Sequence, residues 1–527
     1  MPKQSTARHW MRANTIRFVG HTLLAAVLML GSTRVAAELP DVLTTSTEMV
    51  EQLNRIVEAD PRFTVETIGQ SVEGKDLLAV RVMPKARMAI RWKVLLIGAQ
   101  HGHEHAGKEA ILELLDDIAS GEAQLPPGVE LWAVPMANPD GVDKDQRRNA
   151  NDFDLNRDHL ILSQPETVAL HKLVQRVRPH VIVDCHEFTR DSKSYTDKGW
   201  GEWPLIMMDG ANSPLLPKGF TDAALRWVDD AEPAMRKAGF NYRRYTVGGP
   251  PPDRELRYST LDPDDARNGL SFYGGMGFII ESGIKRSAED PQADLSLRVA
   301  AYRMLLEPFL HRQDLRHPDS LLLSTLVFHR GGGRTIVTNA MWAQVPQLRT
   351  WPDIGPRRYP VIDLETGEDD LAVARNYADT VVIKRRIKRP FAYAILPAHA
   401  DAYADLLNKH AVTYERLDAS KVVSAELATL VRIEEDFDPI YERYGGRQIV
   451  TVETQDAYEI PEGSLWIELD QLLKLEPWTP ENPNVMMPSR AIKVLEPQQL
   501  YGLYQWPQWR ATVGEDGLIP VVRVMAE

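Results

Sequence analysis

The stretch WKVLLIGAQHGHEHAGKEAILELLDDIAS, residues 92–120, predicts a strand, a short loop and a helix. Its first part, Trp92 to Ala99, is apolar apart from Lys93, which is typical of a buried parallel strand. Its last part, from Gly107 onward, spaces apolar residues along one face of a helix. The loop between them therefore lies at the carboxyl end of a strand, the edge at which open α/β sheets hold their ligands.

This loop carries His101 and Glu104, and a second stretch, HVIVDCHEF at residues 180–188, carries His186. The second stretch also reads as a strand, in which Asp184 and His186 point to the same face. Two histidines and a carboxylate form the ligand set of a catalytic zinc site, which keeps its fourth position for water. We therefore predict one Zn²⁺ per chain, bound by His101, Glu104 and His186.

Five motifs follow one another in the order found in the zinc carboxypeptidases related to carboxypeptidase A. They are HGHE, NPDG, RRNANDFDLNRD, VDCHE and GFIIESG. Five ordered motifs are far more specific than any one of them, and the chain resembles this family over roughly residues 45–310. The resemblance implies an α/β fold, a three-layer α/β/α core around a mixed, mostly parallel sheet.

The resemblance also implies roles for individual residues. Glu281 matches the family's general base, a carboxylate that acts first as a base and then as an acid. Arg147 resembles the arginine that stabilises the tetrahedral oxyanion. Asn156 and Arg157 resemble the pair that binds a terminal carboxylate, a task that suits the planar guanidinium group. Asp154 is the expected acceptor for a ligand imidazole, whose tautomer it would fix.

Neighbouring residues are alternatives for these roles. Arg148 adjoins Arg147, and we expect it to be a solvated charge. His103 and His105 alternate with the first histidine ligand, and we expect both to be non-ligands. Cys185 is more simply a small buried apolar residue than a nucleophile.

The tyrosine that closes over the substrate in the digestive members of the family has no clear counterpart. Tyr258 is the nearest candidate by spacing, although we favour the interpretation that it packs on a loop. The specificity pocket should draw on DPDDARNGLS, residues 262–271. There Arg267 could select an acidic substrate side chain, whereas Asp264 or Asp265 could select a basic one, and both hypotheses stay open.

The N-terminus predicts export. Residues 1–37 contain five basic residues and no acidic one, with the apolar run LLAAVLML from Leu23 to Leu30. This pattern, with VAA before Glu38, is typical of a secretory signal peptide cut after Ala37. The run is shorter than the roughly 20 residues of a membrane span, so we expect a periplasmic or secreted protein without stable membrane insertion. An uncleaved anchor is the alternative.

Composition narrows the class further. The 527 residues include 61 basic and 74 acidic ones, a formal net charge of -13, which is not that of a nucleic-acid binder. A single cysteine excludes an internal disulfide. With 43% hydrophobic residues the chain is globular rather than disordered.

The length exceeds that of one typical domain. We predict a signal peptide at 1–37, a zinc carboxypeptidase-like catalytic domain at 38–315 and an α+β, β-rich accessory region at 316–527. In the last of these, PAHADAYADLLNKHAV at 397–412 predicts a helix. Predicted strands are SLLLSTLVFH, RTIVTNA, ADTVVIKRRI and QIVTVETQ. The region resembles the C-terminal extension of some large bacterial members, whose role is unknown.

The resemblance therefore implies an exported, zinc-dependent metallocarboxypeptidase acting on peptides. A cell-wall peptide amidase or endopeptidase with the same core is the first alternative. The second is an inactive family member that binds peptide or peptidoglycan, which the presence of every ligand and of Glu281 disfavours. The oligomeric state and the side-chain specificity are not predicted.

Overall fold

The structure, a computed structural model, describes residues 43–85, 89–311, 335–343, 357–434, 447–469, 487–499 and 502–526. Thr44 to Glu527 form one compact unit. The predicted signal peptide, the predicted strand SLLLSTLVFH and the predicted boundary at 315/316 lie outside the described residues and stay predictions. None of the helices in the described part of the chain is long and apolar enough to cross a membrane.

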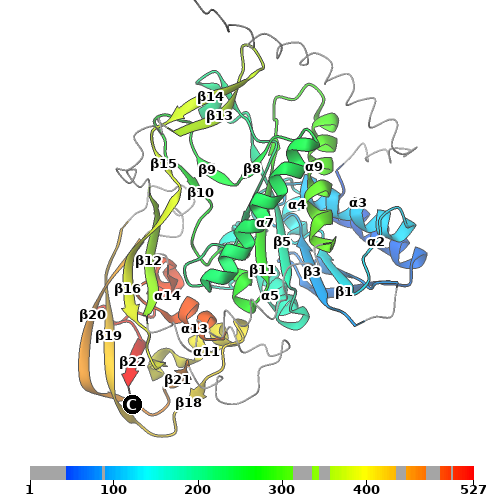
Figure 1. The fold of residues 1–527 in the computed structure, drawn as a ribbon. Coiled ribbons are helices and arrows are strands. Elements are labelled where there is room, and N and C mark those ends of the chain that lie inside the picture. Colours follow the sequence, from blue (N-terminus) through cyan, green and yellow to red (C-terminus); the bar gives the residue numbers. More distant parts are fainter. Residues whose placement is uncertain are drawn as a thin grey trace, which may run out of the picture. The chain divides into compact units, whose positions relative to one another are not determined.

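An eight-stranded sheet organises the first half of the chain (Figure 1). Its order is β1-β2-β4-β3-β5-β11-β7-β8. The strands are β1 (Phe63–Gln70), β2 (Asp76–Val82), β3 (Trp92–Ile97), β4 (Val129–Val134), β5 (Val181–Thr189), β7 (Ile206–Gly210), β8 (Tyr242–Arg244) and β11 (Met276–Ile284). Four of the strand pairs are parallel and three are antiparallel, which confirms the predicted mixed, mostly parallel sheet.

Helices cover both faces of this sheet. Alternation along β3 sends Val94 and Leu96 into one hydrophobic cluster and Leu95 and Ile97 into another. The first cluster draws on α2 (Ser46–Ala59), α3 (Ala106–Ser120), α7 (Lys218–Lys237) and α9 (Pro291–His311). The second draws on α5 (Pro165–Val177) and α8 (Ala266–Gly269). This confirms the predicted three-layer α/β/α core.

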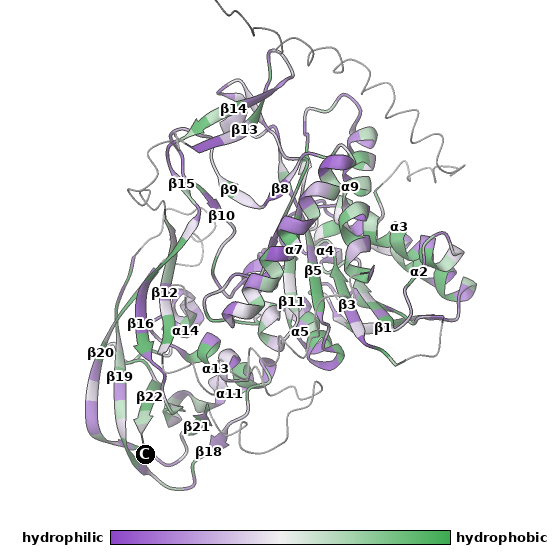
Figure 2. Ribbon diagram, viewed as in Figure 1, coloured by the Kyte–Doolittle hydropathy of each residue, from purple (hydrophilic) through white to green (hydrophobic). Residues whose placement is uncertain are grey.

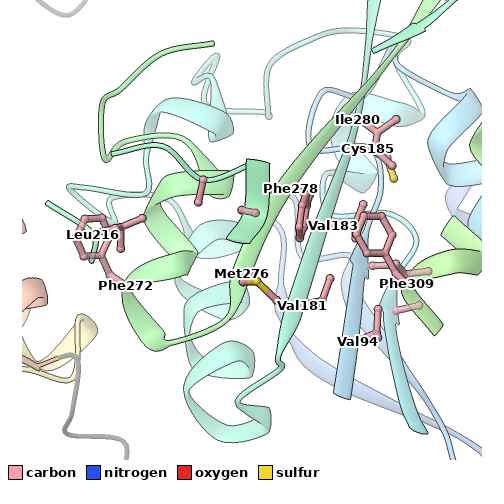
Figure 3. Close-up of a cluster of buried hydrophobic side chains, with 14 of the residues drawn as sticks. Val94, Val181, Val183, Cys185, Leu216, Phe272, Met276, Phe278, Ile280 and Phe309 are labelled. Carbon is pink, nitrogen blue, oxygen red and sulfur yellow. The ribbon is translucent and has the colours of Figure 1, made fainter. Parts of the chain in front are cut away.

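The same alternation along β5 separates the core from the polar edge. Val183 and Cys185 point into the larger cluster, where Cys185 lies beside Ile280 of β11 (Figure 3). Cys185 is 1% exposed, as expected for a small buried apolar residue. The central strands are coloured largely as hydrophobic in Figure 2, because they are covered on both faces. The residues between these apolar positions, Asp184 and His186, face the other side of the sheet.

The C-terminal part is α+β and β-rich, as predicted. Its six-stranded antiparallel sheet has the order β18-β21-β17-β22-β19-β20. The strands are β17 (Ala392–Ile395), β18 (Glu415–Arg416), β19 (Lys421–Glu434), β20 (Arg447–Ile460), β21 (Leu465–Glu468) and β22 (Val521–Ala526). A separate pair joins β12 (Thr335–Ala343) to β16 (Thr380–Lys388). Its main helices are α11 (Ala400–Lys409) and α13 (Met487–Leu495), and the predicted helix at 397–412 is confirmed by α11.

Short strands of the C-terminal part pair with short strands of the first half. β13 (Arg357–Asp363) pairs with β6 (Trp200–Glu202), and β15 (Tyr377–Ala378) pairs with β10 (Leu256–Tyr258). A small hydrophobic cluster that includes Tyr195 and Tyr359 lies between them. The C-terminal part is therefore packed into the fold of the first half rather than joined to it by a linker alone.

Candidate metal centre and catalytic site

His101, Glu104 and His186 converge at the carboxyl edge of the sheet. Nδ1 of His101 lies 3.0 Å from Nδ1 of His186. Oε1 of Glu104 lies 2.8 Å from the His101 nitrogen, and Oε2 lies 2.8 Å from the His186 nitrogen. Among the described residues these three form the group of His, Cys, Asp or Glu side chains that could hold a metal ion, and each is at most 3% exposed. His103 and His105 lie outside the group. Two imidazole nitrogens and a carboxylate facing one point fit the donor set of zinc.

The loop between β3 and α3 is held from behind by the NPDG motif. A Cβ on Gly102 would lie 2.0 Å from the carbonyl carbon of Gly141, so only glycine fits at this contact. Asn138 donates from Nδ2 to the carbonyl oxygen of Gln100 at 3.1 Å, and its Oδ1 accepts from the Gly141 amide at 2.9 Å. Asn138 thereby caps α4 (Pro139–Val142) and fixes the backbone just before the first ligand.

Each ligand imidazole has a carboxylate at its other ring nitrogen. Nε2 of His101 lies 3.0 Å from Oδ1 of Asp154, the acceptor that the sequence indicated, and Nε2 of His186 lies 2.6 Å from Oδ2 of Asp184. Because these carboxylates accept the Nε2 protons, both Nδ1 atoms keep a lone pair for a metal. Burial opposes ionisation of Asp154, but the charges of Arg147 and His101 outweigh it and hold its pKa well below the usual value.

Arg147 is the arginine that faces this site. Its Nη2 lies 2.9 Å from Oδ2 of Asp154, and its Nη1 lies 3.4 Å from Oε1 of Glu104. Arg148 points toward Asp152 instead, at 3.7 Å. The side chain of Arg147 is 40% exposed, so its guanidinium can be reached by a substrate.

Glu281 enters the site from β11, the strand beside β5. It is paired in register with His186, so the two side chains share a face of the sheet. Glu281 is 6% exposed, and burial raises its pKa to about 7, against the opposing charge of His186 and with the support of the Glu104 charge. A carboxyl group with a pKa near neutrality suits proton transfer at neutral pH.

Tyr245 is a site residue that the sequence did not reveal. Its hydroxyl hydrogen-bonds the carboxylate of Glu281. The strand register brings Tyr245 close to Glu281. Glu281 is paired with Met207 of β7, and Met207 is paired with Arg243 of β8. Tyr245 lies two residues beyond Arg243, directly after β8, and its amide still donates to the carbonyl oxygen of Met208 on β7 at 2.9 Å. This contact depends on the pairing of β11, β7 and β8, which residue spacing along the sequence does not predict.

Tyr258 and Arg267, the two weaker candidates, are engaged elsewhere. The ring of Tyr258 packs edge-on against Trp342 and Tyr377, with centroids 5.4 and 5.8 Å away, which agrees with the interpretation of a packed tyrosine. Arg267 is 1% exposed and its Nη2 lies 2.8 Å from the carboxylate of Asp265. An internal carboxylate thus already neutralises its buried guanidinium, which disfavours the hypothesis that Arg267 selects an acidic substrate side chain.

Asp264 and Asp265 differ in their surroundings. Asp265 caps α8, with Oδ1 accepting from the amide of Asn268 at 2.7 Å. Asp264 is 1% exposed, and neither of its carboxylate oxygens has a hydrogen-bond partner among the described residues. Burial raises the pKa of Asp264 well above its usual value, against the charge of Arg157. Asp264 is therefore the acid of this pair that a cationic group could satisfy.

Asn156 and Arg157, the pair predicted to bind a terminal carboxylate, have different contacts in the structure, and their role stays a prediction. Asn156 is 4% exposed, with Nδ2 at 3.1 Å from Nε2 of His186 and Oδ1 accepting from the amide of Ala266 at 2.8 Å. Arg157 is half-buried and donates from Nη1 to the carbonyl oxygen of Asn156 at 2.6 Å. Asn156 thus contacts a metal-site residue and the start of α8. The positive charge of the pair is on the guanidinium of Arg157.

Comparison with known proteins identifies relatives of the N-terminal part. Residues 49–190 match the family described as zinc carboxypeptidase. Carboxypeptidase 2 of Trichophyton tonsurans is 41% identical over 100 residues, which cover 18% of this chain and 19% of the relative. Carboxypeptidase SOL1 of Arabidopsis thaliana is 32% identical over 133 residues, which cover 21% of this chain and 26% of the relative. The chain thus matches about a fifth to a quarter of the length of these curated relatives.

Solved structures resemble the chain only distantly. The crystal structure of a metallo-carboxypeptidase from Burkholderia cenocepacia is 17% identical, covers 51% of this chain and 70% of that chain, and has a TM-score of 0.40. The family match contains the three metal-site residues and Arg147 but ends before Glu281, whose placement rests on the strand register.

Proposed function

We propose that this chain is an exported zinc metallocarboxypeptidase that removes C-terminal residues from peptides, because residues 49–190 match the family described as zinc carboxypeptidase. The observation that carries the proposal is the convergence of His101, Glu104 and His186 beside the buried carboxyl group of Glu281. A catalytic zinc site needs these three ligands, and hydrolysis of an amide needs the nearby base.

Glu281 transfers the proton, and the hydroxyl of Tyr245 orients its carboxylate. Zn²⁺ bound by His101, Glu104 and His186 would polarise the scissile carbonyl and lower the pKa of its water to roughly 7. Glu281, with a pKa raised by burial to about 7, takes a proton from the attacking water and returns it to the leaving amine. The hydroxyl of Tyr245 donates to the same carboxylate and orients it.

Two arginines meet the negative charges of the substrate. Arg147 lies within 3.4 Å of the Glu104 carboxylate, so its guanidinium stands where the oxyanion develops. Arg157 is assigned to the terminal carboxylate, which its planar donors can bind through two hydrogen bonds. Asn156 lies against the ring of His186, and its Oδ1 accepts from the amide of Ala266 at the start of α8.

A peptide with a basic C-terminal residue is the substrate class that we assign to this site, on the surroundings of Asp264. Asp264 is buried and its oxygens have no hydrogen-bond partner among the described residues. It lies close enough to Arg157 for the charge of that arginine to oppose the rise of its pKa. A lysine or arginine side chain bound next to the terminal carboxylate would supply the missing donors.

Export by the signal peptide, residues 1–37, belongs to the same proposal. The support is its basic residues, its short apolar run and the small residues before Glu38. Expression of the full chain in a bacterial host with sequencing of the mature N-terminus tests it. A mature protein that begins at Glu38 in the periplasm or medium is expected, and retention of residues 1–37 in the membrane fraction would contradict it.

Product mapping tests the activity. Purified mature protein with zinc is incubated with panels of peptides and muropeptides, with the Glu281→Gln variant as control, and products are identified by mass spectrometry. Stepwise loss of C-terminal residues that the variant abolishes is the expected result. Cleavage confined to muropeptides would replace the proposal with a cell-wall amidase. Zinc binding without turnover would replace it with a peptide-binding protein.

A further inference from the structure

Behind the metal ligands, a line of hydrogen-bonded side chains runs from Asp184 to Tyr273. Gln100 donates from Nε2 to Oδ2 of Asp184 at 2.8 Å, and its Oε1 lies 3.0 Å from Nε2 of His159. Nδ1 of His159 lies 3.0 Å from Nε2 of His171, and Nδ1 of His171 lies 2.8 Å from the hydroxyl of Tyr273. We call Gln100, His159, His171 and Tyr273 the relay, and its first three members are fully buried.

The direction of each hydrogen bond follows from Asp184. Its carboxylate accepts the amide N–H of Gln100, which turns the oxygen of that amide toward His159. His159 then donates from Nε2 and accepts at Nδ1, as a neutral imidazole must, and burial lowers its pKa to about 3. His171 in turn donates to His159 and accepts the hydroxyl proton of Tyr273. Every proton of the relay therefore points toward Asp184.

Asp184 connects the relay to the metal site. The oxygen that accepts from Gln100 also lies 2.6 Å from Nε2 of His186, a metal-site residue. A carboxylate that fixes a ligand imidazole sets both its tautomer and its ring orientation. Successive hydrogen bonds that point the same way polarise and strengthen one another inside a protein.

The C-terminal part contacts the outer end of the relay. Gln175 donates from Nε2 to the hydroxyl of Tyr273 at 3.3 Å and to the carbonyl oxygen of Lys409, at the end of α11, at 2.7 Å. The guanidinium carbon of Arg490, on α13, lies 5.2 Å from the centre of the Tyr273 ring. Tyr273 is therefore held between its own half of the chain and two helices of the C-terminal part.

Two further side chains from the C-terminal part reach the two histidines. Lys493, fully buried, donates from Nζ to the carbonyl oxygen of His159 at 2.7 Å. His410, also fully buried, donates from Nε2 to the carbonyl oxygen of Leu160 at 2.8 Å. The ring of His410 stands edge-on to the ring of His171, with centroids 5.6 Å apart. Burying the ammonium group of a lysine costs free energy, and the hydrogen bond to the carbonyl oxygen of His159 offsets part of that cost.

We propose that the relay is a set of positioning residues that fixes Asp184, and through it His186, for metal binding, and that the C-terminal part holds the relay in place. The accessory region is then a support of the metal centre within the same chain. This inference rests on the metal site of the proposed function, but it is independent of which bond the enzyme cleaves.

Zinc affinity of the full chain, measured by competition with a chelator, tests the relay. Tyr273→Phe removes only the outermost hydroxyl, and we expect about threefold weaker zinc binding. His171→Phe interrupts the middle, and we expect about tenfold weaker binding. Tyr403→Phe is the matched control, because this fully buried hydroxyl bonds Tyr504 in the C-terminal part at 2.8 Å, outside the relay. Its zinc affinity should equal that of the wild type.

The double variant separates a relay from general loss of packing. Once His171 is replaced, the hydroxyl of Tyr273 has no path to Asp184, so His171→Phe/Tyr273→Phe should bind zinc no more weakly than His171→Phe. Additive losses would overturn the relay. The absorption spectrum of the Co²⁺-substituted protein should change in Tyr273→Phe and stay unchanged in Tyr403→Phe. Equal zinc affinity in Tyr273→Phe, His171→Phe and the control would also overturn it.

Lys493→Met tests the contribution of the C-terminal part. It leaves the carbonyl oxygen of His159 without this donor, and we expect about threefold weaker zinc binding. An affinity equal to that of Tyr403→Phe would show that the C-terminal part does not hold the relay. None of these measurements needs a substrate. A chain that binds zinc through an intact relay but cleaves no peptide would therefore end the proposed function and leave this inference standing.

Discussion

The two halves of this chain bury titratable side chains with different kinds of partner. In the first half, His101, Glu104 and Glu281 gather where the parallel strands β3, β5 and β11 end, and their partners leave atoms free for a metal or a proton. In the C-terminal part, Lys493 and His410 are equally buried, but they donate to backbone carbonyls of the first half. A buried titratable side chain therefore indicates a catalytic or metal-binding role only where its partners leave one of its atoms available to a metal or a proton.

Glu281→Gln should produce the largest effect on the chemical side of this comparison. Loss of the base removes proton transfer, so kcat should fall by about 10³-fold. Because burial disfavours the charge of Glu281, the neutral variant should unfold at the same temperature as the wild type or slightly above it. Peptide hydrolysis rates and thermal denaturation measure the two quantities. A variant that lost stability along with activity would make Glu281 a structural residue.

Tyr359→Ala should produce the opposite pattern. Tyr359 is 1% exposed, lies on β13 and belongs to the cluster that joins the two halves. Its removal should lower the free energy of unfolding by about 3–5 kcal/mol, as for other buried aromatic residues, while kcat of the folded protein stays within about twofold. Leu371→Ala, on the neighbouring strand β14 (Asp369–Ala374), is the control, because Leu371 is 51% exposed. It should change stability by less than about 0.5 kcal/mol.

The contrast also explains what the sequence could predict. Apolar runs were sufficient for β3 and β5, because a strand covered on both faces is largely apolar, and helical spacing was sufficient for α3. The metal-site residues His101 and Glu104 could be predicted because they lie three residues apart in one loop, and His186 because it lies in the VDCHE motif on a predicted strand. These are local relations, which the sequence contains directly.

Contacts between side chains on different strands or turns could not be predicted from the sequence. Tyr245 reaches Glu281 across β7, and the number of residues between them depends on loops whose length no local rule fixes. Arg267 and Asp264 lie three residues apart, yet one is neutralised by an internal carboxylate and the other lacks a hydrogen-bond partner among the described residues. Which acid caps α8 and which is left unpaired depends on the turn of the backbone, and the residue types do not determine it.

Asp264→Asn sharpens the comparison inside the site itself. If the unpaired carboxylate selects a basic side chain, the variant should lose about 10- to 100-fold in kcat/KM for peptides ending in lysine or arginine. Peptides ending in an apolar residue should be cleaved as before or faster. Asp262→Asn is the control, because Asp262 already accepts a hydrogen bond from Thr260. Equal losses for basic and apolar peptides would assign Asp264 to the support of Arg157 instead.

Tyr245→Phe should have the smallest effect and is visible mainly in the pH dependence. The hydroxyl donates to the ionised carboxylate of Glu281 and so lowers its pKa, which burial has raised to about 7. Loss of the hydroxyl should therefore raise this pKa and move the acidic limb of the kcat/KM profile upward by about half a pH unit to one unit.

Tyr242→Phe is the matched control for this shift. Tyr242 lies three residues earlier in the chain, and its hydroxyl donates to the carbonyl oxygen of Val228 at 2.7 Å, within the larger hydrophobic core. Its loss should lower thermal stability and leave the pH profile unchanged. If both variants move the acidic limb equally, the shift reflects a general loosening of β8, and Tyr245 then belongs with the supporting residues rather than with the chemistry.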